Sequence, residues 1–256
     1  AVANNLAVKR ADDCNWIAFL NPDAFAHPEW LEMLVAAAEK HPEYKSFGSH
    51  MLKHKTKKMD GTGDVYHVCG SAWRRDYDVV SLKVDRKIGE IFSPCAAASF
   101  ICKDIFLEVG GFDENFFAYF EDVDLGFRLQ LRGYGSLYVP DAVIEHVGSA
   151  TTSRYSDFAI YHSQRNLVWS YFRNMPNFWY FLPQHILFNL VSLIWFATKG
   201  KARIVLQAKW HALRELPRIW ALRKLTQHEK TVDASVVLRK MNHNFLRPYS
   251  KRKRLL

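Results

Sequence analysis

Acidic side chains occur at two places where the sequence predicts that a strand ends or a helix begins. Asp23 follows the apolar run at 16–20, and open α/β sheets bind ligands beyond the carboxyl ends of their strands. Glu121 and Asp122 open a helical segment much later in the chain. A carboxylate can remove a proton from a hydroxyl group or hold a divalent cation. A structural interpretation stays open at both places, because Asp is common in turns and acidic residues favour helix N-termini.

Longer motifs in a fixed order support a functional interpretation. They read FLNPD at 19–23, GGFDENFF at 110–117 and EDVDLGFR at 121–128, with His146 beyond them. In this order they resemble the family-2 glycosyltransferases of the GT-A fold, and the likeness is greatest to the rhamnosyltransferase-like branch. The resemblance extends over about residues 1–173.

The resemblance implies an inverting transfer of a hexose from a nucleoside diphosphate sugar to a hydroxyl group of an acceptor. Asp122 occupies the position of the family's general base, with Glu121 beside it. Asp23 occupies the place of the D-x-D carboxylate, which is suited to hold Mg²⁺ or Mn²⁺ because these cations prefer oxygen ligands. Asn21 stands where the first acid of that motif is usual, so the resemblance implies a weaker metal site with a single carboxylate. The sugar-transfer interpretation requires Asp23 and Asp122 to face one cleft.

Two further residues match positions near the diphosphate in the same family. His146 follows the predicted strand at 143–145 and corresponds to a histidine near the metal and the diphosphate. Arg165 stands where relatives carry a basic helix residue, and a guanidinium suits the binding of a diphosphate. Structural interpretations stay open here too, with His146 as an ordinary buried or surface histidine and Arg165 as part of a solvated helix face.

The pattern of apolar runs and breakers predicts an α/β domain with a Rossmann-like sheet, which the resemblance identifies with the GT-A type. Residues 16–20 form the kind of short apolar run that is typical of a buried parallel strand. Residues 44–90 are Lys-rich and predict short strands with a surface loop around 61–63. A strand at 137–139 is expected to end at Pro140, because proline cannot donate to a strand ladder.

The chain is expected to divide into a catalytic domain at 1–173 and a helical, basic region at 174–256. A GT-A domain normally begins with strands that bind the nucleotide, and the sequence shows no such strand before Asn4. We therefore expect a sheet that is incomplete at its N-terminus, with an exposed edge and a donor pocket that lacks one wall. A further hypothesis is that this chain alone is poorly active or inactive.

The second region combines an apolar segment with a basic one. Residues 178–198 are about as long as a transmembrane helix, but His185, Asn189 and Ser192 place polar side chains on one face. The segment that follows mixes Lys and Arg with Trp and Leu, which suits an anionic membrane surface. Three arrangements stay open, namely peripheral or monotopic attachment, a true membrane span, and a soluble helical subdomain. The first predicts a cytoplasmic protein at the inner face of the membrane, where a lipid-linked acceptor would lie.

Composition argues against several other classes of protein. The 256 residues carry a net charge of +9, with 49% hydrophobic and 24% charged residues, as in a globular protein. The basic residues alternate with Trp and Leu and form no recognisable nucleic-acid module, so nucleic acid is not expected as a partner. The four cysteines have no metal-ligand spacing, which predicts reduced thiols and no zinc site. The remaining alternative to a transferase of polysaccharide biosynthesis is a non-catalytic scaffold that keeps the fold to bind glycan or a partner enzyme.

Overall fold

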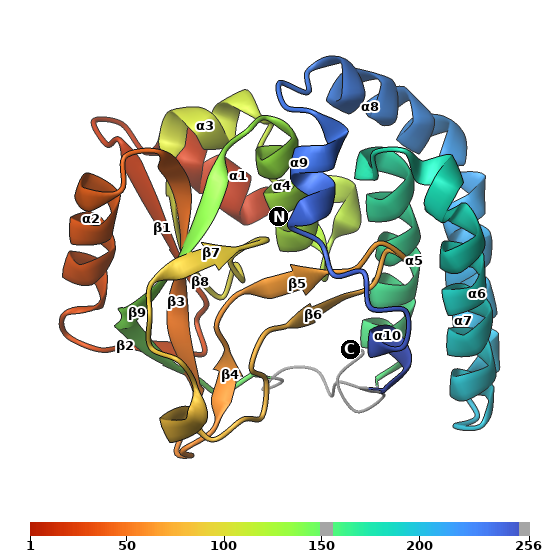
Figure 1. Cartoon of the computed structure of the whole chain (residues 1–256), viewed down its shortest axis with the longest axis horizontal. Coiled ribbons are helices and arrows are strands. Elements are labelled where there is room, and N and C mark those ends of the chain that lie inside the picture. The colour runs from red at the N-terminus through yellow and green to blue at the C-terminus, as the bar shows by residue number, and fades with distance from the viewer. Residues whose placement is uncertain (149–155, 251–256) are drawn as a thin grey trace.

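The computed structural model describes residues 1–148 and 156–250 (Figure 1), so residues 251–256 of the expected C-terminal region fall outside it. The strands are β1 Trp16–Leu20, β2 Ala24–Ala26, β3 Tyr44–Lys53, β4 Met59–Gly61, β5 Asp64–Tyr66, β6 Ala72–Arg74, β7 Gly89–Ile91, β8 Ala98–Cys102 and β9 Gly135–His146. The α-helices are α1 Val2–Arg10, α2 Trp30–Lys40, α3 Lys103–Glu108, α4 Glu121–Leu131, α5 Asp157–Asn174, α6 Phe178–Ala197, α7 Ala202–Arg214, α8 Leu216–His228, α9 Ala234–Arg239 and α10 Arg247–Ser250. Short 3₁₀ helices lie at Ser81–Lys83 and Glu114–Phe116.

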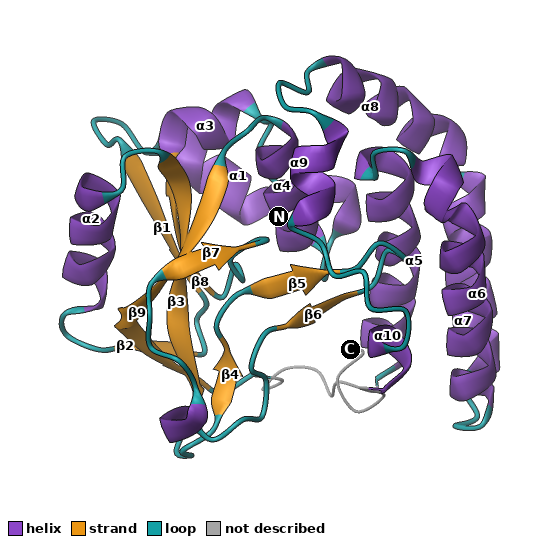
Figure 2. Cartoon of the chain, in the orientation of Figure 1, coloured by secondary structure: helices purple, strands orange, loops and turns teal. Residues whose placement is uncertain are grey.

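A mixed sheet forms the centre of the N-terminal part of the chain (Figure 2). Its main path runs β1-β8-β3-β9-β2, with β4 paired to β3 and β7 paired to β9. β3 and β9 are parallel, and the other neighbours on this path are antiparallel. Helix α2 covers one face through Trp30 and Leu34, while α1, α3 and α4 cover the other face. The expected α/β architecture is therefore present, with helices on both faces of one sheet.

The strand expected at 16–20 is present, but the prediction that it is a buried parallel strand is wrong. β1 pairs antiparallel with β8, and Phe19 is the one residue of β1 whose side chain is fully buried. β1 is the end strand of the main path within the described residues. A short apolar run indicates burial in general, but it does not distinguish a central parallel strand from an end strand with one packed face.

The segment 44–90 differs most from its prediction. Its first part forms β3, the central strand of the main path, whose residues 46–51 are buried although lysines stand near both ends. The predicted surface loop around 61–63 is instead buried between β4 and β5. β9 does not end at Pro140, because an irregularity in its register leaves the proline unpaired with β3 and lets the strand continue to His146.

The C-terminal helices pack against the sheet domain through α5, which contacts α4, α7 and α8. Buried ion pairs fix this junction. Asp124 of α4 accepts hydrogen bonds from Arg128 at 2.9 Å and from Arg173 of α5 at 3.2 Å. Asp124 and Arg128 therefore have the structural role that their i,i+4 spacing indicates.

Helix α6 is the one helix among residues 1–148 and 156–250 that is long and apolar enough to cross a membrane. Core helices of soluble proteins can have the same length and apolar composition. The helix lies beside α7 (Figure 1) and buries Phe188 and Phe196 against the other helices. Several of its other apolar side chains are exposed, among them Ile186, Leu190 and Ile194.

Candidate active site

The register of β2 on β9 brings Asp23 and His146 together. Ala24 of β2 pairs with His146, and the amide of Val147 donates to the carbonyl of Asp23 at 3.0 Å. The two side chains then meet, with 3.2 Å between Oδ1 of Asp23 and Nε2 of His146. His146 is buried, whereas the side chain of Asp23 is 29% exposed. A ligand from solvent can therefore reach the carboxylate while the imidazole stays fixed beneath it.

A second carboxylate holds the imidazole from its other side. Nδ1 of His146 donates to Oδ2 of Asp60 at 2.7 Å. Nε2 of His146 is buried and has no hydrogen-bond partner among the described residues. Histidines that bind metals commonly donate their other ring N–H to a carboxylate, as His146 does here. The arrangement fits a divalent cation held by Asp23 and His146.

The protein supplies few ligands to such a metal site. Within the described residues, no group of three or more His, Cys, Asp or Glu side chains could hold a metal ion. Mg²⁺ in proteins often keeps several waters and takes further ligands from substrate phosphates. Asn21, the residue in place of the first acid, is exposed, and its carbonyl accepts a hydrogen bond from the amide of Ala24 at 3.0 Å. The Asn21 backbone thus closes the turn that presents Asp23.

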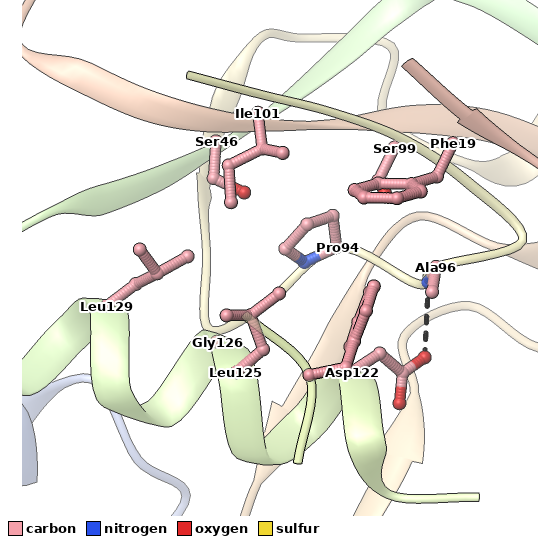
Figure 3. Close-up of a pocket in the computed structure, with 11 residues that line it drawn as sticks. Phe19, Ser46, Pro94, Ala96, Ser99, Ile101, Asp122, Leu125, Gly126 and Leu129 are labelled. Atoms are coloured by element: carbon pink, nitrogen blue, oxygen red, sulfur yellow. Dashed lines mark hydrogen bonds between the residues drawn. The ribbon is translucent and has the colours of Figure 1, made fainter. Parts of the chain in front are cut away.

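Asp122 is positioned by the start of α4 (Figure 3). Its Oδ2 accepts a hydrogen bond from the amide of Ala96 at 3.2 Å, and its Oδ1 accepts one from the amide of Val123 at 2.9 Å. Gly126 permits this approach of the helix, since a β-carbon there would stand 2.0 Å from Cβ of Ser93. Asp122 therefore carries a carboxylate that two amides fix at a partly buried helix N-terminus.

The turn that leads into α4 has a strained backbone. Phe117, Tyr119 and Phe120 have φ angles of 64°, 64° and 68°, in the left-handed region that residues with side chains disfavour. Such strain persists only where surrounding contacts hold it, and it clusters at functional sites. Asn166 of α5 supplies these contacts. Its side-chain amide donates at 2.8–2.9 Å to the carbonyls of Phe116, Ala118 and Tyr119.

Arg165 of α5 also holds the segment that leads into α4. Its Nη2 donates to the carbonyls of Asn115 and Phe116 at 2.9 and 3.0 Å, and its guanidinium lies over the ring of Trp169 at 4.1 Å. These contacts give Arg165 a structural role, and none of them joins it to Asp23 or to the diphosphate side of the site. Its predicted part in diphosphate binding stays a prediction.

Glu121 lies beside Asp122 in a drier environment. Its Oε2 is buried and has no hydrogen-bond partner among the described residues. Burial, together with the charge of Asp122, raises the pKa of Glu121 to about 8. Glu121 is therefore protonated at neutral pH, which suits a hydrogen-bond donor better than a base.

Three charged residues of the site were missed at the level of sequence: Asp60, Asp64 and Arg74. Arg74 forms an ion pair with Asp60, and the pairing of β5 with β6 sets it opposite Asp64. Burial raises the pKa of Asp64 to about 7, and the nearby charge of Asp122 contributes to the rise. The sequence contains one signal for these residues, an Asp on each side of Gly-Thr-Gly at 60–64. This pattern is equally typical of an exposed turn.

Several known proteins resemble this chain. Residues 16–223 match the family described as glycosyl transferase family group 2. An N-acetylglucosaminyl-diphospho-decaprenol L-rhamnosyltransferase of Mycobacterium tuberculosis is 29% identical over 154 residues, which are 55% of this chain and 49% of that protein. The O-antigen biosynthesis protein RfbC of Myxococcus xanthus is 28% identical over 155 residues, which are 58% of this chain and 12% of that protein. The matched chain thus spans about half the length of the first relative and less of the second.

Among solved structures, a crystal structure of GalNAc-T7 with UDP, GalNAc and Mn²⁺ has a TM-score of 0.54 at 14% sequence identity. The likeness covers 72% of this chain and 37% of that one. At such low identity it concerns the fold alone. The sheet and its flanking helices have the GT-A-like architecture that the motifs implied, followed by a helical C-terminal region.

Proposed function

This chain belongs to glycosyl transferase family group 2, and we propose that it transfers a hexose from a nucleoside diphosphate sugar to a glycan or lipid-linked acceptor. The observation that carries the proposal is the meeting of Asp23 with His146, whose imidazole is fixed by Asp60. Arg74 pairs with Asp60, and its positive charge also interacts with the charge of Asp122 on the other side of the site. The transfer proceeds with inversion at the anomeric carbon.

Asp23 and His146 are the residues that would hold a divalent cation, either Mg²⁺ or Mn²⁺. When bound there, such a cation offsets the charge that builds on the leaving diphosphate. Asp60 keeps the imidazole proton on Nδ1 and leaves the lone pair of Nε2 directed toward Asp23. Asn21 closes the turn on the donor side, and Arg165 is the proposed cation nearest the phosphates.

Asp122 is the proposed base. Its carboxylate removes the proton from the acceptor hydroxyl as the hydroxyl oxygen forms a bond to the anomeric carbon. The bond from that carbon to the diphosphate oxygen breaks on the opposite side, so the configuration inverts. The amides of Ala96 and Val123 hold the carboxylate for this step. Glu121, which is protonated at neutral pH, is the proposed hydrogen-bond donor beside it.

Rhamnose or a similar hexose is the proposed sugar, and a lipid-linked or cell-surface glycan is the proposed acceptor. The support comes from the names of two similar proteins. One relative is named as an L-rhamnosyltransferase whose acceptor is N-acetylglucosaminyl-diphospho-decaprenol. The other is named for O-antigen biosynthesis, which agrees with a role in polysaccharide biosynthesis.

Calorimetry with UDP, GDP and dTDP tests the donor side, using the protein expressed from its natural start codon. At least one of these nucleoside diphosphates is expected to bind only with Mn²⁺ present. Affinity should fall about 10- to 100-fold in Asp23→Asn and in His146→Ala, because each removes a ligand of the cation. Asp141→Asn, an exposed carboxylate on β9, is the control and should bind as wild type does. Metal-independent binding, or equal affinity in all four proteins, would contradict the proposed site.

The proposed location is the cytoplasmic face of the membrane, with peripheral or monotopic attachment through α6. Trp179, Tyr180 and Ile194 of this helix are 69%, 80% and 65% exposed. Lys199 and Arg203 are exposed at the turn from α6 to α7. Trp179 and Tyr180 lie at the start of α6 near Arg223 and Lys224 of α8. Aromatic side chains beside basic ones match the boundary between anionic headgroups and hydrocarbon.

Flotation with vesicles tests this attachment. The protein is expected to float with phosphatidylglycerol vesicles more than with phosphatidylcholine vesicles, and high salt should weaken the binding. Ile194→Glu should reduce flotation, because it places a charge on the apolar face of α6. Leu82→Glu is the matched control, since Leu82 is 92% exposed on the 3₁₀ helix Ser81–Lys83, outside α6. Absence of flotation, or an equal loss in both variants, would refute attachment through α6.

A further inference from the structure

We propose that Arg74 is a positioning residue that joins the two halves of the candidate site. Its guanidinium pairs with Asp60, which holds His146 in place. Arg74 also stands opposite Asp64 in the pairing of β5 with β6, and its positive charge interacts with the charges of Asp64 and Asp122. The inference rests on the proposed function, because it takes Asp122 as the base and His146 as part of the donor side.

The fold of the β5–β6 hairpin aims Arg74 at the site. Arg74 ends β6 and stands opposite Asp64 of β5. Gly61 of β4 leaves room for its side chain, since a β-carbon at Gly61 would lie 3.2 Å from Cβ of Arg74 and 3.4 Å from its Cδ. The stem of Arg74 therefore crosses the bare backbone of β4, and its Nη1 reaches Asp60 in the middle of that strand.

On the donor side, Arg74 completes the surroundings of a buried carboxylate. Oδ2 of Asp60 accepts hydrogen bonds from both Arg74 and Nδ1 of His146. Removing one partner of a buried ion pair is strongly destabilising, because the remaining charge stays buried without compensation. Loss of Arg74 would therefore leave Asp60 free to turn away from His146, and the imidazole would lose its fixed orientation.

On the base side, Arg74 balances two acidic groups that lie close to each other. Asp64 is buried, and Oγ of Ser93 lies 3.5 Å from its Oδ2. The charge of Asp122 raises the pKa of Asp64 beyond the effect of burial, whereas Arg74 lowers it. Neighbouring carboxylates cannot all stay ionised in a buried site without a cation between them. Without Arg74, the pKa of Asp64 is expected to rise further, and the carboxylates would lose the cation that offsets their charge.

The other titratable groups that face this pair do not replace the guanidinium. Glu121 stands next to Asp122 on α4 and is itself protonated at neutral pH. Burial raises the pKa of the Cys95 thiol well above its ordinary value, so it stays neutral. Asp60 adds a further negative charge near Asp64. Among these groups Arg74 carries the positive charge.

Arg75 provides a matched control for loss of a cation from the same hairpin. Its Nε donates to Oγ1 of Thr62 at 2.7 Å, and its guanidinium lies 5.1 Å from the ring centre of Tyr138. The Arg75 side chain is therefore held by partners other than Asp60, the carboxylate with which Arg74 pairs. If the two arginines only stabilised the hairpin, loss of either one would have the same effect on the carboxylates.

The test is a ¹³C carboxyl NMR titration of aspartate-labelled wild type, Arg74→Gln and Arg75→Gln, with Asp64→Asn and Asp122→Asn used to assign the signals. Arg74→Gln is expected to raise the titration midpoint of Asp64 by about one pH unit or more, because a neighbouring cation favours the ionised carboxylate. Arg75→Gln should leave the Asp64 midpoint close to that of wild type. An unchanged Asp64 midpoint in Arg74→Gln, or the same rise in Arg75→Gln, would overturn the proposal.

A second arm uses turnover of the best donor from a nucleotide-sugar panel. Arg74→Gln should lower kcat about 10- to 100-fold, because Asp60 would no longer hold His146 firmly in place. If Arg74→Gln does not fold, Arg74→Lys replaces it, and its kcat should fall about tenfold because lysine lacks the forked geometry. Wild-type midpoints together with wild-type kcat in Arg74→Lys would also overturn the proposal. Full activity of Asp122→Asn would instead refute the proposed base and leave the titration result to stand separately.

Discussion

Gly126 of α4 lies directly against Ser93, so that a β-carbon on Gly126 would stand 2.0 Å from Cβ of Ser93. No pair of β-carbons tolerates that distance without a shift of the backbone. This contact sets how closely α4 approaches the segment before β8. The turn of α4 before Gly126 carries Asp122, whose carboxylate reaches the amide of Ala96.

Gly126→Ala is expected to push α4 away from Ser93. We expect the free energy of unfolding to fall by about 1–3 kcal/mol, as for other overpacked cores, and turnover to fall because Asp122 is displaced. Urea denaturation and initial rates measure the two effects. Adding Ser93→Gly removes the opposing β-carbon and should recover much of both. A Gly126→Ala protein with wild-type turnover would show that this spacing does not matter for the base.

Asn166→Ala is expected to release the strained turn before α4. The substitution removes the donor that three backbone carbonyls share, which should lower the free energy of unfolding by about 2 kcal/mol. Turnover should fall more than this loss of stability explains, since the turn positions Asp122. Asn189→Ala is the control, because the Asn189 amide donates to His185 within α6. Equal turnover of the two folded variants would contradict a role of the turn in catalysis.

Glu121→Gln is expected to change how stability depends on pH. The folded-state pKa of Glu121 is about 8 against an ordinary value of 4.5, so the folded protein holds a proton there that the unfolded chain releases. The stability due to this group is complete below about pH 4.5 and is lost as the pH rises toward 8. Glutamine mimics the protonated form, so the variant should be more stable than wild type by at least about 1 kcal/mol at pH 8, with little difference at pH 4.

Urea denaturation at several pH values measures this difference. Glu39→Gln, on the exposed face of α2, is the control and should follow wild type throughout. A Glu121→Gln protein whose stability parallels that of wild type from pH 4 to 8 would mean that Glu121 is ionised in the folded protein.

The sequence alone predicted an element or a contact where the local residue pattern and a motif agree. The acidic start of α4 and its end near Gly133 follow from helix-terminus preferences, and the structure has α4 at Glu121–Leu131. The meeting of Asp23 with His146 was implied by the motif order and depends on one register, that of β2 on β9. The long helix α6 follows directly from its apolar composition.

The sequence alone did not predict the structure where pairing between segments far apart in the chain determines it. Nothing local to residues 44–53 indicates a central strand, because their burial depends on β8 and β9, which come much later in the chain. Asp60, Asp64 and Arg74 were missed for the same reason, since a Gly-rich turn with charged neighbours has the composition of a surface loop. Only the packing of the β5–β6 hairpin turns these charges inward.

The role of Asp122 as the base is tested most directly by the rate of sugar transfer by Asp122→Asn, measured with a panel of nucleotide sugars and Mn²⁺ on the protein expressed from its natural start codon. Asparagine keeps the size of the side chain and removes the group that accepts the proton. With Asp141→Asn as the control for loss of an exposed carboxylate, we expect kcat to fall about 1,000-fold for Asp122→Asn alone. Transfer by Asp122→Asn at the rate of the control would contradict this role.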